Sequence, residues 1–230
     1  MKCLSFVAVL GSLSLVPAPA PLRADGFSFS EHGGCASGLA GAFIARACTN
    51  DPSSLFYNPA AVTLVSGTRL SIGGTAILNA SEYRFLSPIG GATTVLDENE
   101  TFFPVHAFLS HQINDRLAVG LAFFIPYGLG TEWGTPQANV GRFVGYNTEI
   151  LAHYTQPTVA YRLSPQIAVG AGLEIAYTTA ELNRLVDLRD IEGTESLDPT
   201  TYPPLTYSAA DAHLSANGWS LGFVASVLIE

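Results

Sequence analysis

The stretch RLAVGLAFFIPYG, residues 116–128, decides the fold class of the chain because every second residue in it is bulky. The bulky set is Leu117, Val119, Leu121, Phe123, Ile125 and Tyr127. A period of two predicts a β-strand, and the residues between are mostly alanine and glycine. The water-facing side of a soluble sandwich would instead carry charged and polar side chains. The pattern therefore favours a transmembrane β-barrel, with bulky side chains toward lipid and small ones toward the lumen.

Five further runs share this period of two. They are residues 69–80, 101–113, 149–163, 166–182 and 218–230. Together with 116–128 they predict about six antiparallel strands in an all-β fold. The joins at 114–116 and 164–166 are tight and rich in turn-forming residues, whereas the other three joins are long. Alternation of short and long joins is typical of outer-membrane barrels, which have tight periplasmic turns and long external loops.

The first 26 residues, MKCLSFVAVLGSLSLVPAPAPLRADG, have the pattern of a secretory signal peptide. One lysine precedes an apolar run and small residues follow, so we expect residues 1–24 to be removed. The predicted location is the outer membrane of a Gram-negative cell. The expected partners there are outer-membrane lipid, periplasmic chaperones and the barrel-assembly machinery. Cys35 and Cys48 remain in an oxidising compartment, which leaves both a disulfide and free thiols open.

Charge and composition exclude several classes of function. Charged residues make up 13% of the chain, and the formal net charge is −9. An acidic chain with scattered arginines is a poor nucleic-acid binder. No His or Cys residues have the spacing of zinc ligands, so we predict no metal. After the signal there is no run of about 20 apolar residues for a spanning helix, so any membrane crossing must be made by strands.

Residues 25–67, between the signal peptide and the first predicted strand, have no strand period. They contain the stretch SSLFYNPAAV, residues 53–62, in which a rigid corner follows two aromatic residues. Asn58 is a favourable N-cap and Pro59 suits the first position of a helix, so we expect a brief helix to begin here. The residues of this motif are Phe56, Tyr57, Asn58, Pro59 and Ala60.

Four quoted stretches carry a family resemblance. They are DGFSFSEHGGCASGLAGAF at 25–43, NDPSSLFYNPAAVTLV at 50–65, PYGLGTEW at 126–133 and QPTVAYRLSPQIAVGAGLEIAY at 156–177. In these stretches the chain resembles the long-chain fatty acid outer-membrane transporters of the FadL/TodX type. The resemblance implies a barrel plugged by an N-terminal hatch, residues 25–67, that contains the Asn-Pro-Ala corner. It also implies that hydrophobic molecules bind among the external loops, enter a lumen pocket and leave sideways at a kinked third strand. Pro126 and Gly128 interrupt that strand.

The number of strands departs from the family pattern. The resemblance implies fourteen strands, and residues 68–230 supply about six. Six strands leave unpaired edges in lipid, where each unsatisfied backbone group costs on the order of several kcal/mol. We therefore expect the chain to be the N-terminal portion of a longer transporter.

Four candidate ligand-binding residues lie on the lumen-facing side of the predicted strands. Phe108 and Phe124 are bulky residues there, and they either line an apolar pocket or pack against the hatch. His106 and Glu174 share the same side, and a buried carboxylate needs a partner. Arg46 in the hatch is the candidate partner of Glu174, through an ion pair between hatch and wall.

The second long join contains candidate residues for an initial docking patch. Trp133, Phe143 and Tyr146 would supply apolar surface, and Arg142 would bind a carboxylate headgroup. Exposed aromatic residues of this kind also serve as anchors at the membrane interface, so this alternative stays open.

The predicted function is passive transport of long-chain fatty acids or similar hydrophobic compounds, without catalysis. We also predict no cofactor, because binding of a hydrophobic molecule in an apolar pocket and its release into the bilayer run downhill in free energy. A structural or adhesin-like barrel with a permanent plug is the alternative. A barrel lipid hydrolase using His106 and Ser110 is a weaker alternative, because no oriented base or oxyanion site accompanies them.

Overall fold

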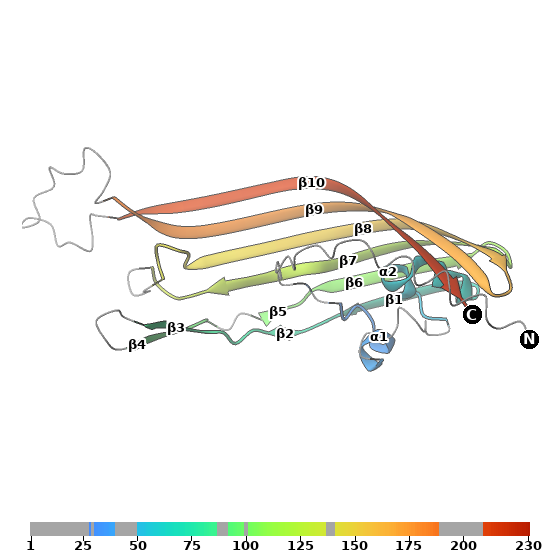
Figure 1. The fold of residues 1–230 in the computed structure, drawn as a ribbon, viewed down its shortest axis with the longest axis horizontal. Helices are drawn as coiled ribbons and strands as arrows, with labels where there is room; N and C mark the ends of the chain where they lie inside the picture. Colours follow the sequence, from blue (N-terminus) through green and yellow to red (C-terminus); the bar gives the residue numbers. More distant parts are fainter. Residues whose placement is uncertain are drawn as a thin grey trace, which may run out of the picture.

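The structure, a computed structural model, describes residues 28, 30–39, 50–86, 92–98, 101–136, 141–188 and 209–230. Its main feature is one antiparallel sheet in the strand order β1-β6-β7-β8-β9-β10 (Figure 1). The strand bounds are Thr68–Gly74 for β1, Val105–Gln112 for β6, Leu117–Glu132 for β7, Asn147–Ser164 for β8, Ile167–Asp187 for β9 and Ala209–Ile229 for β10. The all-β prediction with about six strands is confirmed. The predicted signal peptide, Arg46 and Cys48 lie outside the described residues.

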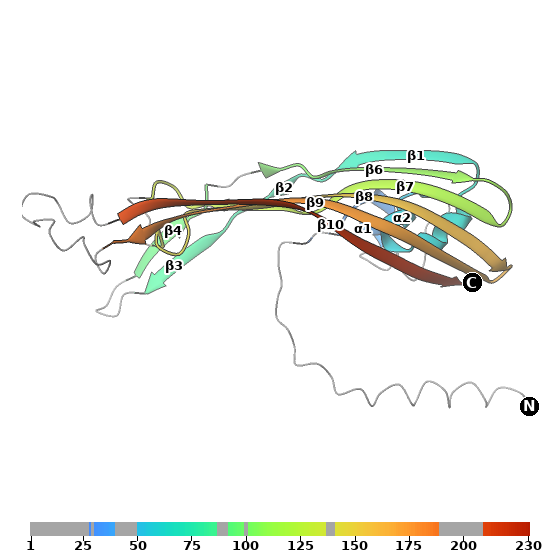
Figure 2. The same ribbon diagram turned by 90° about the horizontal axis from the view of Figure 1, so that it is seen from above.

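The sheet is curved and open. Each strand pairs with the next one in this order through an antiparallel ladder, and β1 and β10 form the two edges. The strands curve around two short helices, α1 (Gly34–Gly38) and α2 (Ser54–Tyr57), and the 3-10 helix η3 (Pro59–Leu64), as Figure 2 shows. Among the described residues, no helix combines the length and apolar character needed to cross a membrane.

The two faces of the sheet differ as the alternation predicts. Bulky apolar residues on the convex face are exposed, among them Leu70, Ile72, Leu109, Leu121, Leu173, Leu221 and Phe223. Buried residues on the concave face include Phe108, Ala118, Ala122, Phe124, Ala160, Ala168 and Ala176. The core therefore lies between the concave face and the short helices. A water-facing sheet with this convex face would expose far more contiguous apolar surface than a soluble monomer does.

Strands β9 and β10 extend well beyond the runs that the sequence predicts. On the convex side of β10, apolar residues begin at Trp219, and the residues before it on the same side are Asp211, His213, Ser215 and Asn217. Trp219 pairs with Tyr177, and their rings lie 4.9 Å apart. Aromatic residues gather where a barrel meets the membrane interface, so this pair marks the outer boundary of the apolar band. Beyond this boundary, β9 and β10 continue without the alternation of apolar residues by which a strand is predicted from sequence.

The long join between β1 and β6 contains four short strands. They are β2 (Ile77–Leu78), β3 (Glu82–Leu86), β4 (Ala92–Leu96) and β5 (Thr101–Phe102). β3 pairs with β4 as a hairpin, and β2 pairs with β5. The predicted strand at 69–80 is thus divided, because β1 ends at Gly74.

Strand β7 is irregular near its middle. Its register with β8 shifts between Phe124 and Tyr127. Proline has no backbone N–H for the ladder, so Pro126 explains the break. The bulge turns Tyr127 inward, where it pairs with Ala152 on the concave face, although the alternation predicted it on the bulky outer face. The predicted interruption of this strand at Pro126 is confirmed.

Candidate functional site

Residues 50–67, here called the corner segment, form a compact unit near the end of the sheet where the tight turns lie (Figure 1). The Asn58 side chain accepts a hydrogen bond at 3.2 Å from the N–H two residues on, and Pro59 begins η3. Asn50 has a φ of 62°, and its Oδ1 accepts hydrogen bonds from the N–H and hydroxyl of Ser66 at 2.9 and 2.7 Å. The brief helix predicted at the Asn-Pro-Ala corner is confirmed.

The corner segment touches the sheet most closely at two glycines. A Cβ on Gly170 of β9 would lie 2.4 Å from the backbone nitrogen of Ala60. A Cβ on Gly120 of β7 would lie 2.4 Å from Cδ2 of Leu55. Both distances are far shorter than van der Waals contact. At Gly170 the obstacle is backbone, so only glycine admits the segment there, whereas at Gly120 a Cβ would force the end of the Leu55 side chain to move. The small residues on the concave face of the sheet thus leave space for the corner segment of the same chain.

Hydrogen bonds from three wall side chains complete this contact. Each satisfies a backbone group at an end or in a turn of the short helices, where intrahelical partners are missing. The bonds are Gln156 Nε2 to the Leu55 carbonyl at 2.8 Å, Arg162 to the Thr63 carbonyl at 2.9 Å, and the Ala60 N–H to Ser226 Oγ at 2.8 Å. The segment is therefore fixed to β8 and β10 as well as packed against β7 and β9.

Aromatic rings fill the space between the corner segment and strands β6 and β7. The ring centroid of Phe124 lies 4.8 Å from that of Phe56 and 6.5 Å from that of Phe108. His32 lies 4.4 Å from Phe56, and His106 lies 5.5 Å from Phe108. Phe108 and Phe124 are 0% and 2% exposed. Of the two alternatives for these residues, the structure places them in packing against the segment.

The seam between the corner segment and β6 also contains polar atoms. Within the part of the chain that the structure describes, Oγ of Ser53, Ser54 and Ser110 and Nδ1 of His106 are buried without a hydrogen-bond partner. A buried polar atom left unpaired costs about 1–3 kcal/mol. The seam is therefore less strongly held than the contacts at the two glycines. Ser110 has no base bonded to its hydroxyl, so the geometry gives no support to a hydrolase.

Glu174 lies on the inner face of β9, beside β10. Its Oε2 is 3.0 Å from the position that a Cβ on Gly222 would take. Arg46, the predicted partner, lies outside the described residues, so this ion pair stays a prediction. Cys35 is disulfide-bonded. No cluster of three or more potential metal ligands occurs among the described residues.

At the opposite end of the sheet, Asp97 joins the β3–β4 hairpin to the end of β7. Asp97 is 3% exposed, and its Oδ1 accepts a hydrogen bond from the Glu132 N–H at 3.0 Å. Its own N–H donates to the carbonyl of Ser81 at 3.0 Å. The Asn79 side chain donates to its other oxygen. This aspartate was not among the predicted site residues, because one acidic residue in a long join gives no signal of burial.

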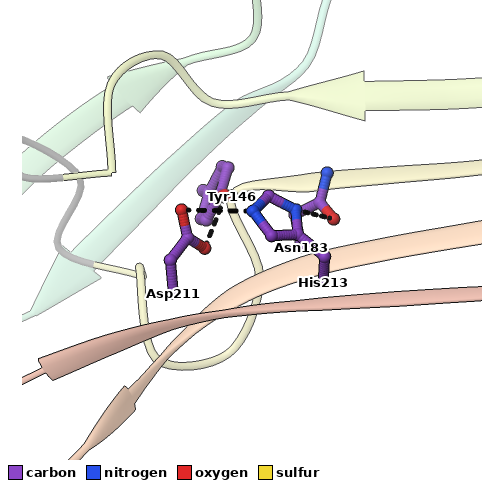
Figure 3. Close-up of polar contacts among 4 residues, drawn as sticks. All are labelled: Tyr146, Asn183, Asp211 and His213. Atoms are coloured by element: carbon purple, nitrogen blue, oxygen red, sulfur yellow. Dashed lines mark hydrogen bonds and ion pairs between the residues drawn. The ribbon is translucent and has the colours of Figure 1, made fainter.

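Tyr146 fastens the turn before β8 to β9 and β10 (Figure 3). Its hydroxyl donates to Asp211 Oδ1 at 2.8 Å, and its N–H donates to the Asn183 carbonyl at 2.9 Å. Asp211 also lies 3.4 Å from His213, which contacts the Asn183 side chain at 2.9 Å. Burial, reinforced by the bond to Asp211, raises the pKa of Tyr146 to about 12. Its phenol is therefore a permanent donor at neutral pH.

The other predicted docking residues make separate contacts. The Arg142 guanidinium lies over the Phe143 ring, 4.9 Å from its centroid. Trp133 meets Tyr83 of β3 edge to face, with 6.4 Å between ring centroids. The side chains of the four residues are thus divided among three contacts, and a hydrogen bond from the Trp133 N–H to the Tyr146 carbonyl at 2.8 Å joins two of the residues. Tyr83, which was not among the predicted docking residues, is the partner of Trp133.

Comparison with known proteins gives consistent matches. The sequence profile of the family described as outer membrane protein transport protein (OMPP1/FadL/TodX) matches residues 19–230. An outer membrane protein of Neisseria meningitidis serogroup B is 30% identical over 50% of this chain and 26% of its own length. The long-chain fatty acid transport protein of Salmonella typhi is 27% identical over 89% of this chain and 47% of its own length. The chain thus spans about half, or less, of these relatives.

A solved structure supports the fold. The crystal structure of a Pseudomonas aeruginosa FadL homologue superimposes with a TM-score of 0.66 and 21% identity, covering 90% of this chain and 50% of that one. The family consists of transport proteins of the outer membrane, which confirms the predicted location and the prediction that the chain is not an enzyme. The chain belongs to the outer membrane protein transport protein family, OMPP1/FadL/TodX.

Proposed function

We propose that this chain takes part in the passive passage of long-chain fatty acids or similar hydrophobic compounds across the outer membrane, as the N-terminal portion of a barrel. Residues 25–67 act as its hatch. The observation that carries the proposal is the seating of the corner segment on Gly120 and Gly170, on the concave face of a sheet whose convex face is apolar and exposed. No cofactor is needed, because an apolar molecule that leaves water for a dry path moves downhill in free energy.

The proposed path of the hydrophobic molecule runs between the hatch and the wall of the barrel. Phe108 and Phe124 are covered by the corner segment, and next to them lie polar atoms without partners on Ser110 and His106 within the described part of the chain. When the segment shifts, the two rings become an apolar lining with a few polar groups, the composition usual for ligand sites. Glu174 lies further along the same face. The lumen residues therefore bind substrate only after the hatch moves.

Uptake of radiolabelled oleate by Gram-negative cells that lack their own fatty acid transporter tests this function. Cells whose outer membrane carries the full-length barrel that includes this chain should accumulate oleate faster than cells with an empty plasmid. Changing Phe108 and Phe124 to Asn in that barrel should abolish the gain while the amount of protein in the outer membrane stays the same. A full-length barrel that reaches the outer membrane and gives no gain would contradict the transport proposal and favour an adhesin-like barrel.

A further inference from the structure

A cavity of about 300 Å³ lies between α1 and β1, the edge strand of the sheet (Figure 1). The other described residues that line it are four glycines and Ile72, whose side chain is exposed on the convex face. The polar side chains that line it are those of Glu31, Ser37, Ser71, Thr75 and His106. The cavity is therefore a polar space beside the apolar packing of the hatch.

The concave side of β1 continues this polar surface toward the end of the sheet with the tight turns. Its residues pair with those of β6 as Arg69 with Ser110, Ser71 with Phe108 and Gly73 with His106. Of these six residues, Phe108 alone has an apolar side chain. On β7, by contrast, the concave side carries only alanine, glycine and phenylalanine between residues 118 and 124. We call the cavity together with the surface formed by Arg69, Ser71, Gly73, His106 and Ser110 the polar strip.

Buried polar atoms lie along the polar strip and on the hatch surface that faces it. Within the described part of the chain, Ser110 Oγ, His106 Nδ1 and the Oγ atoms of Ser53 and Ser54 have no hydrogen-bond partner. Ser53 adjoins the cavity, because its Oγ is 2.7 Å from the position of a Cβ on Gly33, which lines the cavity. Such atoms cost free energy unless water reaches them. A water molecule takes about 30 Å³ in the liquid, so the cavity has room for several.

The contacts that seat the corner segment lie away from the polar strip. The close packing is with β7 and β9, and the wall hydrogen bonds come from β8 and β10. Along the strip, the hatch is bonded near both ends. Thr75 Oγ1 donates to the Glu31 carbonyl at 3.0 Å, and the Gln112 N–H donates to the Gly67 carbonyl at 2.9 Å. Water can therefore fill the strip without loss of the contacts that seat the hatch.

Charges of both signs border the polar strip. Glu31 lines the cavity, and Asp51 Oδ1 accepts a hydrogen bond from the Ser53 N–H at 2.9 Å. Arg69 is exposed near the end with the tight turns, and His106 adds a positive charge only when it is protonated. An anion meets like charge at the two carboxylates, and a cation meets it at the arginine. The strip therefore favours uncharged solutes.

We propose that the polar strip is a water-filled path by which small uncharged polar solutes cross the outer membrane beside the seated hatch. Polar, water-filled interiors give solutes their passage through porin barrels. The inference rests on the proposed barrel, but it does not rest on the transport of hydrophobic compounds, which needs the hatch to move. Passage of a polar solute is measured without fatty acid, so the two claims fail separately.

Cysteine accessibility in the full-length barrel tests whether the strip holds water. S110C places a thiol in the strip, and A122C places one on the same face of β7, opposite Phe108. Ser110 and Ala122 are 1% and 0% exposed, so burial alone does not distinguish them. The reagent is 2-hydroxyethyl methanethiosulfonate, which is small, polar and uncharged, and the wild-type barrel gives the background from native cysteines. S110C should react about tenfold faster, because the reactive thiolate forms less readily in apolar surroundings.

Equal rates for S110C and A122C would overturn the proposal. Two slow rates would show that the strip is dry. Two fast rates would show that the whole hatch leaves the wall, so that no separate polar path exists.

Swelling of lipid vesicles in isotonic arabinose tests passage itself. Vesicles with the full-length barrel should swell faster than vesicles without protein. S110L puts an apolar side chain into the strip and should lower the protein-dependent rate about fivefold at an equal amount of folded barrel. S220L is the matched control, because Ser220 pairs with Ala176 on the concave face of β10, away from the strip, and its rate should equal that of wild type. A wild-type rate no higher than that of empty vesicles, or an S110L rate equal to that of S220L, would overturn the proposal.

Discussion

The corner segment and the external loops are held to the same sheet by different kinds of contact. Under the corner segment, the wall provides the space left by Gly120 and Gly170, and the contact is mainly close packing, with three hydrogen bonds from wall side chains added. At the outer end, Asp97 and Tyr146 make directed hydrogen bonds between loops and strands. Close packing responds to every added or removed methyl group, whereas one hydrogen bond contributes about 0.5–1.5 kcal/mol. The hatch region should therefore tolerate substitution far less than the loops do.

Leu55→Ala should have the largest effect, because Leu55 is 0% exposed and packs with Val62, Phe108 and Phe124. Loss of its side chain leaves a cavity, and we expect the free energy of unfolding to fall by about 2–5 kcal/mol. Urea titration of the chain in lipid vesicles measures it. Leu78→Ala is the control, because Leu78 is 81% exposed, and its effect should stay within about 0.5 kcal/mol.

A double-mutant cycle with Gly120→Ala sharpens the same test. Alone, the new methyl group collides with Leu55 Cδ2. Combined with Leu55→Ala, it enters the cavity, so the double variant should be more stable than the sum of the single effects predicts. Additive effects would show that the leucine and the glycine do not form one contact.

Gly170→Ala should have the next largest effect, because its Cβ meets backbone atoms, which cannot rotate away. The nearest is the nitrogen of Ala60 at 2.4 Å. We expect a loss of about 1–3 kcal/mol in the free energy of unfolding, together with faster proteolysis of the corner segment. Gly218→Ala on β10 is the matched control, because a Cβ there has nothing within 4 Å. Equal stability of both variants would mean that the segment is not seated on Gly170.

The sequence predicted the sheet well where one face is apolar and failed where it is not. The alternation at 116–128 identifies β7, but the outer part of β10, from Ala209 to Asn217, carries polar residues on the convex side and lies outside the predicted strand at 218–230. Outside the lipid, both sides of a strand meet water, so the period of two in hydrophobicity disappears. The inward turn of Tyr127 was likewise missed, because a bulge changes which side a residue faces without changing the sequence pattern.

For the candidate site, the sequence identified the Asn-Pro-Ala corner but not the wall residues that hold it. Asn58 and Pro59 have strong local preferences, so their cap and helix are predictable. Gly170 and Gln156 act through a long-range contact, and nothing local distinguishes this glycine from Gly172 two residues away. Tyr146 was interpreted as a docking residue because an aromatic residue in a loop suggests exposure. In the structure its hydroxyl bonds to Asp211, 65 residues further along the chain, a contact that no local pattern predicts.

Tyr146→Phe should have the smallest effect of the series and tests the loop side of the comparison. It removes the hydroxyl that bonds to Asp211 and leaves that carboxylate, whose side chain is 45% exposed, to water. We expect a loss of about 0.5–1.5 kcal/mol in the free energy of unfolding at neutral pH. A loss of stability as large as that of Leu55→Ala would contradict the distinction between a corner segment held mainly by packing and loops held by hydrogen bonds.

The pH dependence of this difference identifies its cause. An unfolded tyrosine releases its proton at a pH of about 10, whereas the pKa of Tyr146 in the folded chain is raised to about 12. The folded state thus keeps a proton that the unfolded state loses. The extra stability of wild type over Tyr146→Phe should be complete below about pH 10 and should disappear as the pH rises through about 12. The measurement is the urea midpoint of both chains from pH 7 to 12. The phenol keeps its proton in both the folded and the unfolded state at pH 7 to 9. A stability difference between the two chains that decreases within this range would therefore contradict the hydrogen bond from the phenol as its cause.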